Sequence, residues 1–424
     1  MQINESYATL SRNGIEPISY AKVAMDPVRN PFVPGAGAPP PTLEGRAAVL
    51  ERARITLERL KAGRQAKSFL LVGLRGVGKT VLLNEIDGLA KRLGCRTLVF
   101  ENHEGKSLPA LLVPPLRALL LQLDRGEQVN AYVKRGLRVL KGFAKAVKVK
   151  HGEIEIGLDI DPEAGMADSG DLEADLPDLF VVVAEAAKAR GTSVVVIIDE
   201  LQYLSEIEFS ALIMAIHRIC QRQLPLALIG AGLPQLVALA GRSKSYAERL
   251  FDFPGIGALT LEDAALAIAE PIQTEGASID PAALDRIVAV TERYPYFLQE
   301  WGYHAWNVSA GPVITLADVE TATDIAIRSL DESFFRVRLD RLTPTERDYL
   351  RAMADLGPGP HRSGDVADRL SRAVESVAPL RNGLIKKGSV YSPAHGDTAF
   401  TVPLFDAFMR RSIPTWTPLP RGSR

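Results

Sequence analysis

Residues 73–80 have the types and the spacing of a phosphate-binding loop. They read GLRGVGKT, which fits G-x-x-x-x-G-K-T, and they follow the apolar run 69–72. Glycines at this spacing let backbone N–H groups turn toward a phosphate, and the positive end of the following helix points at the same charge. The lysine of such a loop, here Lys79, reaches the β- and γ-phosphates, and the hydroxyl of Thr80 binds Mg²⁺. We therefore expect a nucleotide to be bound by Gly73, Leu74, Arg75, Gly76, Val77, Gly78, Lys79, Thr80 and Val81.

Two adjacent carboxylates follow a second apolar run. Residues 194–198 are an unbroken β-branched stretch that ends on Asp199 and Glu200. Continuous apolar strands are typical of parallel sheets covered on both faces. A carboxylate at the carboxyl end of such a strand lies beside the phosphate loop, so Asp199 is expected to hold Mg²⁺ together with Thr80. Glu200 is expected to act as the general base that polarises water, while Lys79 neutralises developing phosphate charge. The loop and the acidic pair together predict ATP hydrolysis, and a strand that merely ends in two solvated acids is the less favoured interpretation.

The elements that must position these residues follow from periodicity. Apolar residues at Leu82, Ile86 and Leu89 mark one face of a helix that starts in the loop, and Gly94 ends it. Further helices are predicted over about 47–61 and 206–221, and strands over 97–101 and 226–229. The last strand is expected beside the phosphate loop. The sequence thus predicts an α/β nucleotide domain with a parallel sheet.

Composition sets the class of protein. With 424 residues, 46% hydrophobic and 24% charged, the chain has the make-up of a soluble globular protein of two to three domains. No apolar stretch is long enough to cross a bilayer, and the polar start is no secretion signal. Only two cysteines, Cys95 and Cys220, indicate a reducing compartment without a disulfide framework. We expect a cytoplasmic protein with no membrane partner.

Charge is nearly balanced overall but uneven along the chain. A net charge of -1 argues against a protein that coats nucleic acid along its whole surface, whereas residues 341–424 carry thirteen Lys/Arg against eight Asp/Glu, a net of +5. Basic residues also recur at helical spacing over 134–148, and such a face either meets phosphates or an acidic partner or is simply solvated. The alternation over 147–160 predicts a small hairpin inserted in the nucleotide domain, followed by a solvated acidic loop.

Several further motifs make residues 30–411 resemble the AAA+ ATPases nearest origin-recognition-type initiators and the STAND switch ATPases. The segment 34–37 with Gly45 and Arg46 is similar to the adenine-side box of that family, and Pro295 in 291–298 is similar to the lid proline near the base. Arg249 lies in a segment similar to the one carrying an arginine finger, which would complete a neighbouring subunit's site. Arg293 stands where the family has glycine, either as a sensor arginine or as a distortion of the turn.

One departure from the family concerns the strand at 226–229. The family often ends this strand with a polar residue that senses the γ-phosphate, whereas here it ends in 230–232, Gly-Ala-Gly. The departure predicts slow hydrolysis unless Gln202 or Gln235 takes that role.

The resemblance implies a domain order. We expect an N-terminal extension over 1–43, a P-loop nucleotide domain over 44–258 with an insert at about 131–165, a helical lid over 259–335 and a winged-helix domain over 340–413. Helices predicted at 345–356, 364–370 and 371–387, followed by a hairpin, support the last of these. The third helix of a winged helix commonly enters the DNA major groove. Its expected DNA contacts are Arg372, Arg381, Lys386 and Lys387.

Two functions follow from this organisation. The first is an ATPase whose nucleotide state drives a conformational or assembly switch and which binds double-stranded DNA through the winged helix. The alternative is a STAND-like signalling switch with slow ATP turnover, whose winged helix makes protein contacts only, since winged helices also serve as packing modules. Either function implies ATP or ADP with Mg²⁺, and a homo-oligomer or another protein as partner.

Overall fold

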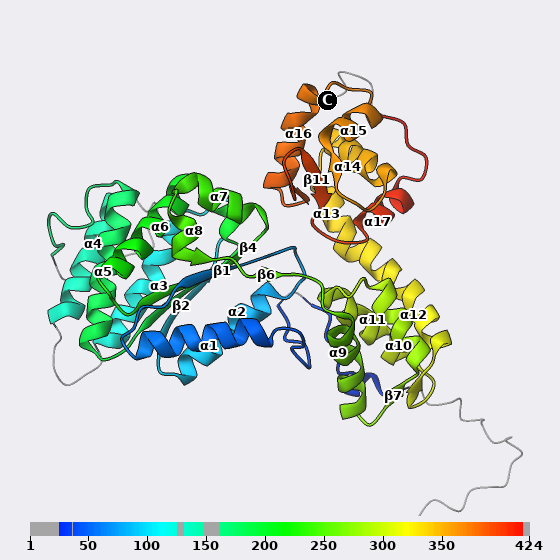
Figure 1. Ribbon diagram of the computed structural model, residues 1–424, viewed down its shortest axis with the longest axis horizontal. Helices are drawn as coiled ribbons and strands as arrows, with labels where there is room; N and C mark the ends of the chain where they lie inside the picture. The colour runs from blue at the N-terminus through cyan, green and yellow to red at the C-terminus, as the bar shows by residue number, and fades with distance from the viewer. Residues whose placement is uncertain (1–24, 36, 125–130, 148–160, 419–424) are drawn as a thin grey trace, which may run out of the picture.

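The computed structural model describes residues 25–35, 37–124, 131–147 and 161–418. Figure 1 shows an α/β lobe on one side, a helical region on the other, and a small C-terminal unit above that region. None of the helices described is long and apolar enough to span a bilayer. The hairpin predicted at 147–160 lies almost wholly outside the described residues, so that prediction stays untested.

A parallel sheet of six strands forms the centre of the α/β lobe in the part of the chain described. The strands run in the order β2-β3-β4-β1-β5, and β6 also pairs with β1. Their bounds are Ser68–Gly73 (β1), Arg96–Glu101 (β2), Val194–Asp199 (β3), Leu226–Gly232 (β4), Phe251–Asp252 (β5) and Gly255–Ile256 (β6). Both β3 and β4 are buried along their whole length, as apolar strands between two helix layers must be. β4 pairs with β1 as predicted, with Phe69 opposite Ile229.

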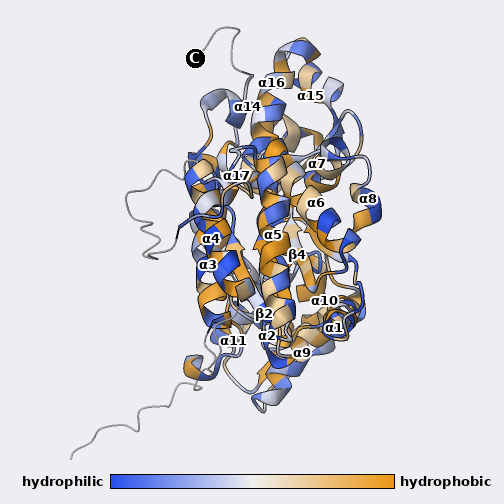
Figure 2. Ribbon diagram, turned by 90° about the vertical axis from the view of Figure 1, so that its left-hand side faces the viewer, coloured by the Kyte–Doolittle hydropathy of each residue, from blue (hydrophilic) through white to orange (hydrophobic). Residues whose placement is uncertain are grey.

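Helices cover both faces of this sheet. They are α1 (Ala47–Lys61), α2 (Lys79–Arg92), α3 (Leu108–Leu123), α4 (Ala131–Ala146), α5 (Leu172–Ala189), α6 (Glu206–Gln221), α7 (Gln235–Ser243) and α8 (Ala247–Leu250). The predicted bounds of α1 and α6 are confirmed. Figure 2 shows α5 between α4 and α6 with mostly hydrophobic residues, in agreement with its buried apolar side chains.

The basic face of α4 is partly neutralised within the lobe. Arg135 Nε lies 2.9 Å from Glu163 Oε1, and Arg138 Nη2 lies 3.4 Å from Glu163 Oε2. Arg135 also lies 3.5 Å from Glu185. These pairs engage Arg135 and Arg138, whereas Lys134 and Lys145 on the same helix are exposed, so a phosphate-binding role of this face stays a prediction.

The helical region comprises α9 (Leu261–Thr274), α10 (Pro281–Val290), α11 (Pro295–Val308) and α12 (Leu316–Ser329), with a short two-stranded pairing of β7 (Ser278–Ile279) and β8 (Val313–Ile314). The N-terminal segment packs on this region. Phe32 is buried against α11, and Asn30 Nδ2 donates to Tyr303 O at 3.0 Å and to Asn307 Oδ1 at 2.9 Å. Residues 37–46 then cross from the helical region to the nucleotide lobe.

A π-helical turn, Leu330–Phe335, and the short α13, Arg336–Asp340, lead from α12 to the C-terminal unit. This unit contains α14 (Pro344–Leu356), α15 (Ser363–Arg369), α16 (Val374–Lys386) and α17 (Phe405–Ser412), with β9 (His361–Arg362), β10 (Val390–Tyr391) and β11 (Asp397–Phe400). Its antiparallel sheet has the order β10-β11-β9. The elements follow the predicted order of three helices and a hairpin, but the third helix starts at Val374, three residues later than expected.

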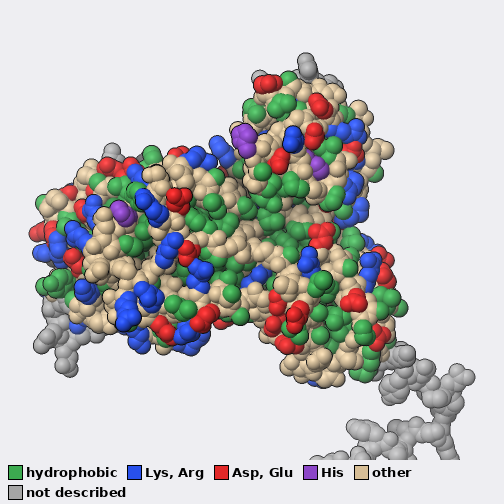
Figure 3. All heavy atoms as spheres, viewed as in Figure 1, with side chains coloured by type: hydrophobic (Ala, Val, Ile, Leu, Met, Phe, Trp, Pro, Cys, Tyr) green, Lys and Arg blue, Asp and Glu red, His purple; other side chains and the backbone are tan. Residues whose placement is uncertain are grey.

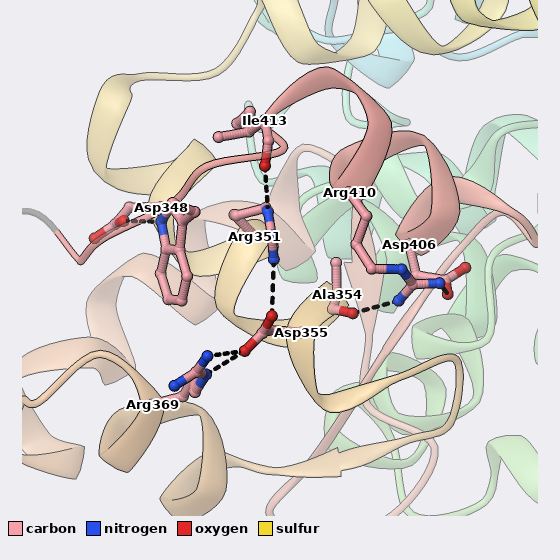
Figure 4. A network of polar contacts seen from close by, with 9 residues as sticks. Asp348, Arg351, Ala354, Asp355, Arg369, Asp406, Arg410 and Ile413 are labelled. Atoms are coloured by element: carbon pink, nitrogen blue, oxygen red, sulfur yellow. Dashed lines mark hydrogen bonds and ion pairs between the residues drawn. The ribbon is translucent and has the colours of Figure 1, made fainter.

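An arginine-centred network ties the end of this unit to α14 (Figure 4). Arg351 is buried; its Nε donates to Ile413 O at 2.9 Å, and its Nη1 donates to Asp355 Oδ1 at 3.3 Å. Its guanidinium also lies 5.4 Å from the ring centre of Trp416. Burial alone would raise the pKa of Asp355, but hydrogen bonds from Arg369 and Arg351 outweigh it and lower that pKa. The network therefore holds the segment after α17 against α14.

Replacing Arg351 by alanine should destabilise the C-terminal unit by about 2–4 kcal/mol, because the change removes a buried donor and leaves the Ile413 carbonyl and Asp355 with fewer partners. Amide hydrogen exchange across α14 measures the effect. Arg362→Ala, at an exposed position of β9, is the control and should change protection little. Equal protection in the two variants would contradict the role given to the network.

Candidate nucleotide site

The predicted phosphate loop joins β1 to α2 in the conformation that such a loop needs. Gly76 and Gly78 have φ of 81° and 89°, a left-handed backbone that only glycine adopts without cost. Lys79 begins α2 directly after the second of them. Its buried Nζ donates to Gly73 O at 2.9 Å and to Leu74 O at 2.6 Å. The amine is thus held over the loop, where a phosphate would replace two backbone carbonyls as its partner.

The acidic pair lies beside this loop, as the sequence predicts. Thr80 Oγ1 donates to Asp199 Oδ2 at 2.5 Å, so the first turn of α2 and the end of β3 are in contact. Glu200 has φ of 56°, and its N–H donates to Asp199 Oδ1 at 2.8 Å. A hydroxyl and a carboxylate this close are oxygen ligands suited to Mg²⁺. The residues present therefore fit the metal that the sequence implies.

Gln202 links Glu200 to the neighbouring strand. Its Oε1 accepts from Leu233 N at 3.1 Å, just after β4, and its Nε2 donates to Glu200 Oε2. Of the two glutamines proposed to replace the missing polar residue of β4, Gln202 has this position. Gln202, which follows β3, thus supplies a polar side chain at the end of β4, where β4 itself has Gly-Ala-Gly.

A cavity of about 360 Å³ opens between the nucleotide lobe and the helical region, a volume suited to a small ligand. Figure 3 shows the surface hollowed between these two parts, with hydrophobic side chains in the hollow. One wall is charged or polar and comes from the loop, from Glu200 and from α13. The residues of this wall are Arg75, Gly76, Val77, Gly78, Lys79, Thr80, Glu200 and Arg338. The other wall comes from residues 33–46, α9 and α11.

Three cations converge on this cavity. Burial lowers the pKa of Lys79 to about 8, and the nearby Arg75 lowers it further while Glu200 and Asp199 oppose the shift. Burial also lowers the pKa of Arg338 to about 10, again with a contribution from Arg75. Because the three groups repel one another, a polyanion in the cavity would relieve unfavourable charge. The electrostatics therefore favour a phosphate ligand.

Nucleotide affinity should decrease above pH 8. Lys79 is half neutral at about pH 8 in the empty cavity, and a bound phosphate requires the charged amine, so binding takes up a proton at higher pH. We expect the dissociation constant to rise by up to about tenfold per pH unit above 8. Titration calorimetry in buffers of different ionisation enthalpy measures both the affinity and the proton uptake.

The matched control for this titration is Lys79→Arg, whose guanidinium stays charged over the same range. Its affinity, whatever the absolute value, should depend less on pH. A parent protein with constant affinity and no proton uptake between pH 7.5 and about 9.5 would contradict the assignment.

The predicted adenine-side residues differ in whether they line the cavity. Pro295 and Arg46 line the cavity, whereas Gly45 does not. The Arg46 guanidinium donates to Val77 O at 3.2 Å and to Gly257 O at 2.6 Å, and burial lowers its pKa. The Arg46 side chain therefore links the phosphate loop to the segment after β6, and its charged group is engaged with backbone carbonyls.

Neither Arg249 nor Arg293 lines the cavity. Arg249 is exposed on α8, so its contact with a neighbouring subunit stays a prediction. Glu292 and Arg293 have φ of 51° and 60°, and Arg293 O accepts from Leu259 N at 3.0 Å. This left-handed backbone is one that glycine adopts without cost and that other residues adopt only under strain. Of the two alternatives for Arg293, the geometry favours a strained turn over a sensor arginine.

Sequence reasoning missed Arg338 and Asn102. Arg338 reaches the cavity from α13, where its guanidinium lies 3.7 Å from the Phe334 ring centre and donates to Phe334 O at 2.5 Å. Asn102 is completely buried; its N–H donates to Asp199 O at 3.0 Å, but its side-chain amide has no hydrogen bond among the described residues. The sequence could have indicated Asn102, because it is a polar residue directly after β2. It could not have indicated Arg338, whose position in the cavity depends on the π-helical turn before α13.

The predicted DNA contacts of the C-terminal unit are largely engaged within it. Arg381 Nε donates to Thr398 Oγ1 at 2.7 Å, and its Nη2 donates to Asp397 O at 2.8 Å. Lys387 Nζ lies 2.7 Å from Glu346 Oε2. Arg372 is half-buried just before α16, whereas Lys386 is exposed on it. Arg381 therefore joins α16 to the hairpin and Lys387 joins it to α14, which does not support either as a free phosphate contact.

Comparisons with known proteins agree with this geometry. Residues 42–229 match the AAA ATPase domain family, and residues 332–409 match a domain family of unknown function. No curated protein matches the sequence.

Among solved structures, the chain is similar to the Walker-type ATPase of Pyrococcus abyssi, with 16% identity, 87% of this chain and 96% of that one covered, and a TM-score of 0.50. The Aeropyrum pernix ORC1 protein in complex with DNA matches at 14% identity over 90% and 96% of the two chains, with a TM-score of 0.45. The Thermotoga maritima RuvB Holliday junction branch migration motor matches at 15% identity over 88% and 96%, with a TM-score of 0.42. The parallel sheet and the phosphate loop agree with the family match: residues 42–229 match the AAA ATPase domain family, and the α/β lobe has the fold of a P-loop nucleotide-binding protein.

Proposed function

We propose that this protein binds ATP with Mg²⁺ in the cavity between its two parts and hydrolyses it to switch the position of its C-terminal unit. The observation that carries the proposal is the 2.5 Å contact between Thr80 and Asp199, beside Lys79 in the loop and Glu200 in the cavity wall. Hydrolysis of a phosphoanhydride needs phosphate positioning, charge neutralisation and an oriented water. Lys79 would position and neutralise the phosphates, Thr80 and Asp199 would hold the metal, and Glu200 would orient the water.

The roles follow from the contacts. Lys79 exchanges its two backbone partners for phosphate oxygens, and the N–H groups of the loop bind the same anion. Glu200 accepts the proton of the attacking water, and Gln202 orients its carboxylate. Thr80 and Asp199 would hold Mg²⁺, which neutralises phosphate charge when bound.

The C-terminal unit contacts the phosphate loop itself. Gly388, two residues after α16, is buried with φ of 67°, and a Cβ there would lie 2.8 Å from Arg75 Nη2 and 3.3 Å from Leu233 Cδ1. Arg75 in turn donates to the hydroxyl of Tyr203 at 2.8 Å. Arg338 approaches the same cavity from the connection to this unit. Phosphates bound or released at Arg75 and Arg338 would therefore bias how the unit docks.

A matched pair of glycine variants tests this switch. Gly388→Ala adds a methyl group against Arg75, whereas Gly396→Ala, at φ of 82° in the same unit, has similar backbone strain but meets no atom within 4 Å. Spin labels on the nucleotide lobe and on α15 report the distance between them with ADP and with a non-hydrolysable ATP analogue. We expect the parent and Gly396→Ala to change distance with nucleotide and Gly388→Ala to lose the change. The same response in all three proteins would refute the coupling.

Binding of DNA through a winged helix is the second candidate function. It is supported by the order of helices and hairpin in the C-terminal unit, by its net positive charge and by the exposed Lys386. The internal contacts of Arg381 and Lys387 favour instead the alternative, in which this unit makes protein contacts only. Binding to a DNA duplex measured against salt separates them, since phosphate contacts give affinity that decreases steeply with ionic strength. No affinity at low salt with ATP present would reject DNA association.

A further inference from the structure

Two polar atoms in the cavity wall formed by residues 33–46 and α11 have no hydrogen-bond partner among the described residues. Gln299 Oε1 and Thr42 Oγ1 are both closed off from solvent and unpaired among the described residues, and both side chains line the cavity. A buried polar atom without a partner costs about 1–3 kcal/mol, so such atoms point to a missing ligand.

The position of these residues indicates which part of a nucleotide they face. Gln299 lies one helical turn beyond Pro295 on α11, and Thr42 lies in the segment that crosses from the helical region. The phosphate groups belong at the glycine loop with Lys79, and the first turn of α11 meets that loop, since Tyr296 N–H donates to Gly76 O at 3.2 Å. Gln299 lies three residues further along the helix. The same wall carries the apolar residues Val33, Pro40, Leu43, Ala267 and Leu298, besides Glu44 and Arg46, and the Arg46 guanidinium is engaged with backbone carbonyls. An apolar slot with few polar atoms is the environment that a planar base fills.

We propose that Gln299 and Thr42 read the edge of the adenine base and make the site selective for adenine nucleotides. This inference rests on the proposed function. The terminal torsion of a glutamine is soft, so the carboxamide can turn its oxygen into the cavity at little cost. A carboxamide pairs with adenine through two bonds, accepting from the 6-amino group and donating to a ring nitrogen. Guanine presents two acceptors on the corresponding edge and leaves the glutamine oxygen unpaired. Thr42 supplies a hydroxyl to a further ring nitrogen.

A ligand pair that differs by one group provides the test. Purine riboside 5′-diphosphate lacks only the 6-amino group of ADP. The parent protein should bind ADP at least about tenfold more tightly than this analogue, because the analogue leaves the Gln299 oxygen unpaired. In Gln299→Leu, ADP should bind about 10- to 100-fold more weakly and the preference for ADP over the analogue should disappear. Thr42→Val should weaken both ligands.

Two control variants distinguish a failure of this inference from a general effect of the substitutions. Gln273→Leu changes an exposed glutamine on α9 and should leave both affinities unchanged. Gln299→Glu keeps an acceptor of the same length, so it should retain the preference for the 6-amino group, and it serves if the leucine variant does not fold. A parent that binds ADP, combined with an unchanged ADP preference in Gln299→Leu, would overturn this inference alone. A parent that binds no nucleotide at all would overturn the proposed function with it.

Discussion

The Glu200→Gln variant should hydrolyse ATP about 10²–10⁴ times more slowly than the parent while binding it with similar affinity. The amide keeps the shape of the carboxylate and its contact with Gln202, but it cannot accept a proton from water. The loop, Lys79 and Thr80 remain intact, so substrate binding is preserved. Single-turnover hydrolysis of radiolabelled ATP, combined with equilibrium binding, measures the two effects separately.

Glu206→Gln is the matched control for this variant. Glu206 is an exposed carboxylate in the first turn of α6, only six residues further along the chain. The Glu206→Gln variant should hydrolyse ATP at the parent rate. If Glu200→Gln also turned over at the parent rate, Glu200 would not be the general base and the contact with Gln202 would be structural only.

The Lys79→Ala variant should lose nucleotide binding, with a dissociation constant raised by about 10²-fold or more. The buried amine lies over the loop, against Gly73 O and Leu74 O, whereas the side chains of Arg75 and Arg338 line other parts of the cavity and do not fill this place. Fluorescence of a bound nucleotide analogue measures the loss.

Lys91→Ala controls for the removal of a lysine from the same helix. Lys91 lies in the last turn of α2, is exposed and pairs with Asp87 at 2.6 Å. The Lys91→Ala variant should bind nucleotide with the affinity of the parent. A Lys79→Ala protein with parent affinity would mean that the loop does not contact the phosphates.

The phosphate loop and the acidic pair could be predicted from the sequence because both are local patterns. A loop of fixed spacing between an apolar strand and a helix has few possible conformations, and two carboxylates after a buried strand must emerge at the same sheet edge. The contact between Thr80 and Asp199 follows from these constraints although the two residues are 119 positions apart. The bounds of α1 and α6 followed from their apolar periodicity.

The remaining parts of the site depend on contacts that no local pattern encodes. Arg338 reaches the cavity only because a π-helical turn precedes α13, and π-helical turns have no clear sequence signature. Gly388 meets Arg75 only when the C-terminal unit is docked on the nucleotide lobe. Arg381 was predicted to contact DNA because it is basic and lies on the third helix, yet its partners in the hairpin decide its role. Burial and pairing of charged groups are tertiary properties, and spacing along one helix does not reveal them.

Titration calorimetry of the full chain with ATP, with and without Mg²⁺, tests the central claim most directly. The account predicts binding of one nucleotide per chain that is clearly tighter with Mg²⁺, because Thr80 and Asp199 contribute only through the metal, and that is lost in Lys79→Ala. A folded parent protein with no magnesium-dependent binding of adenine nucleotides would contradict it.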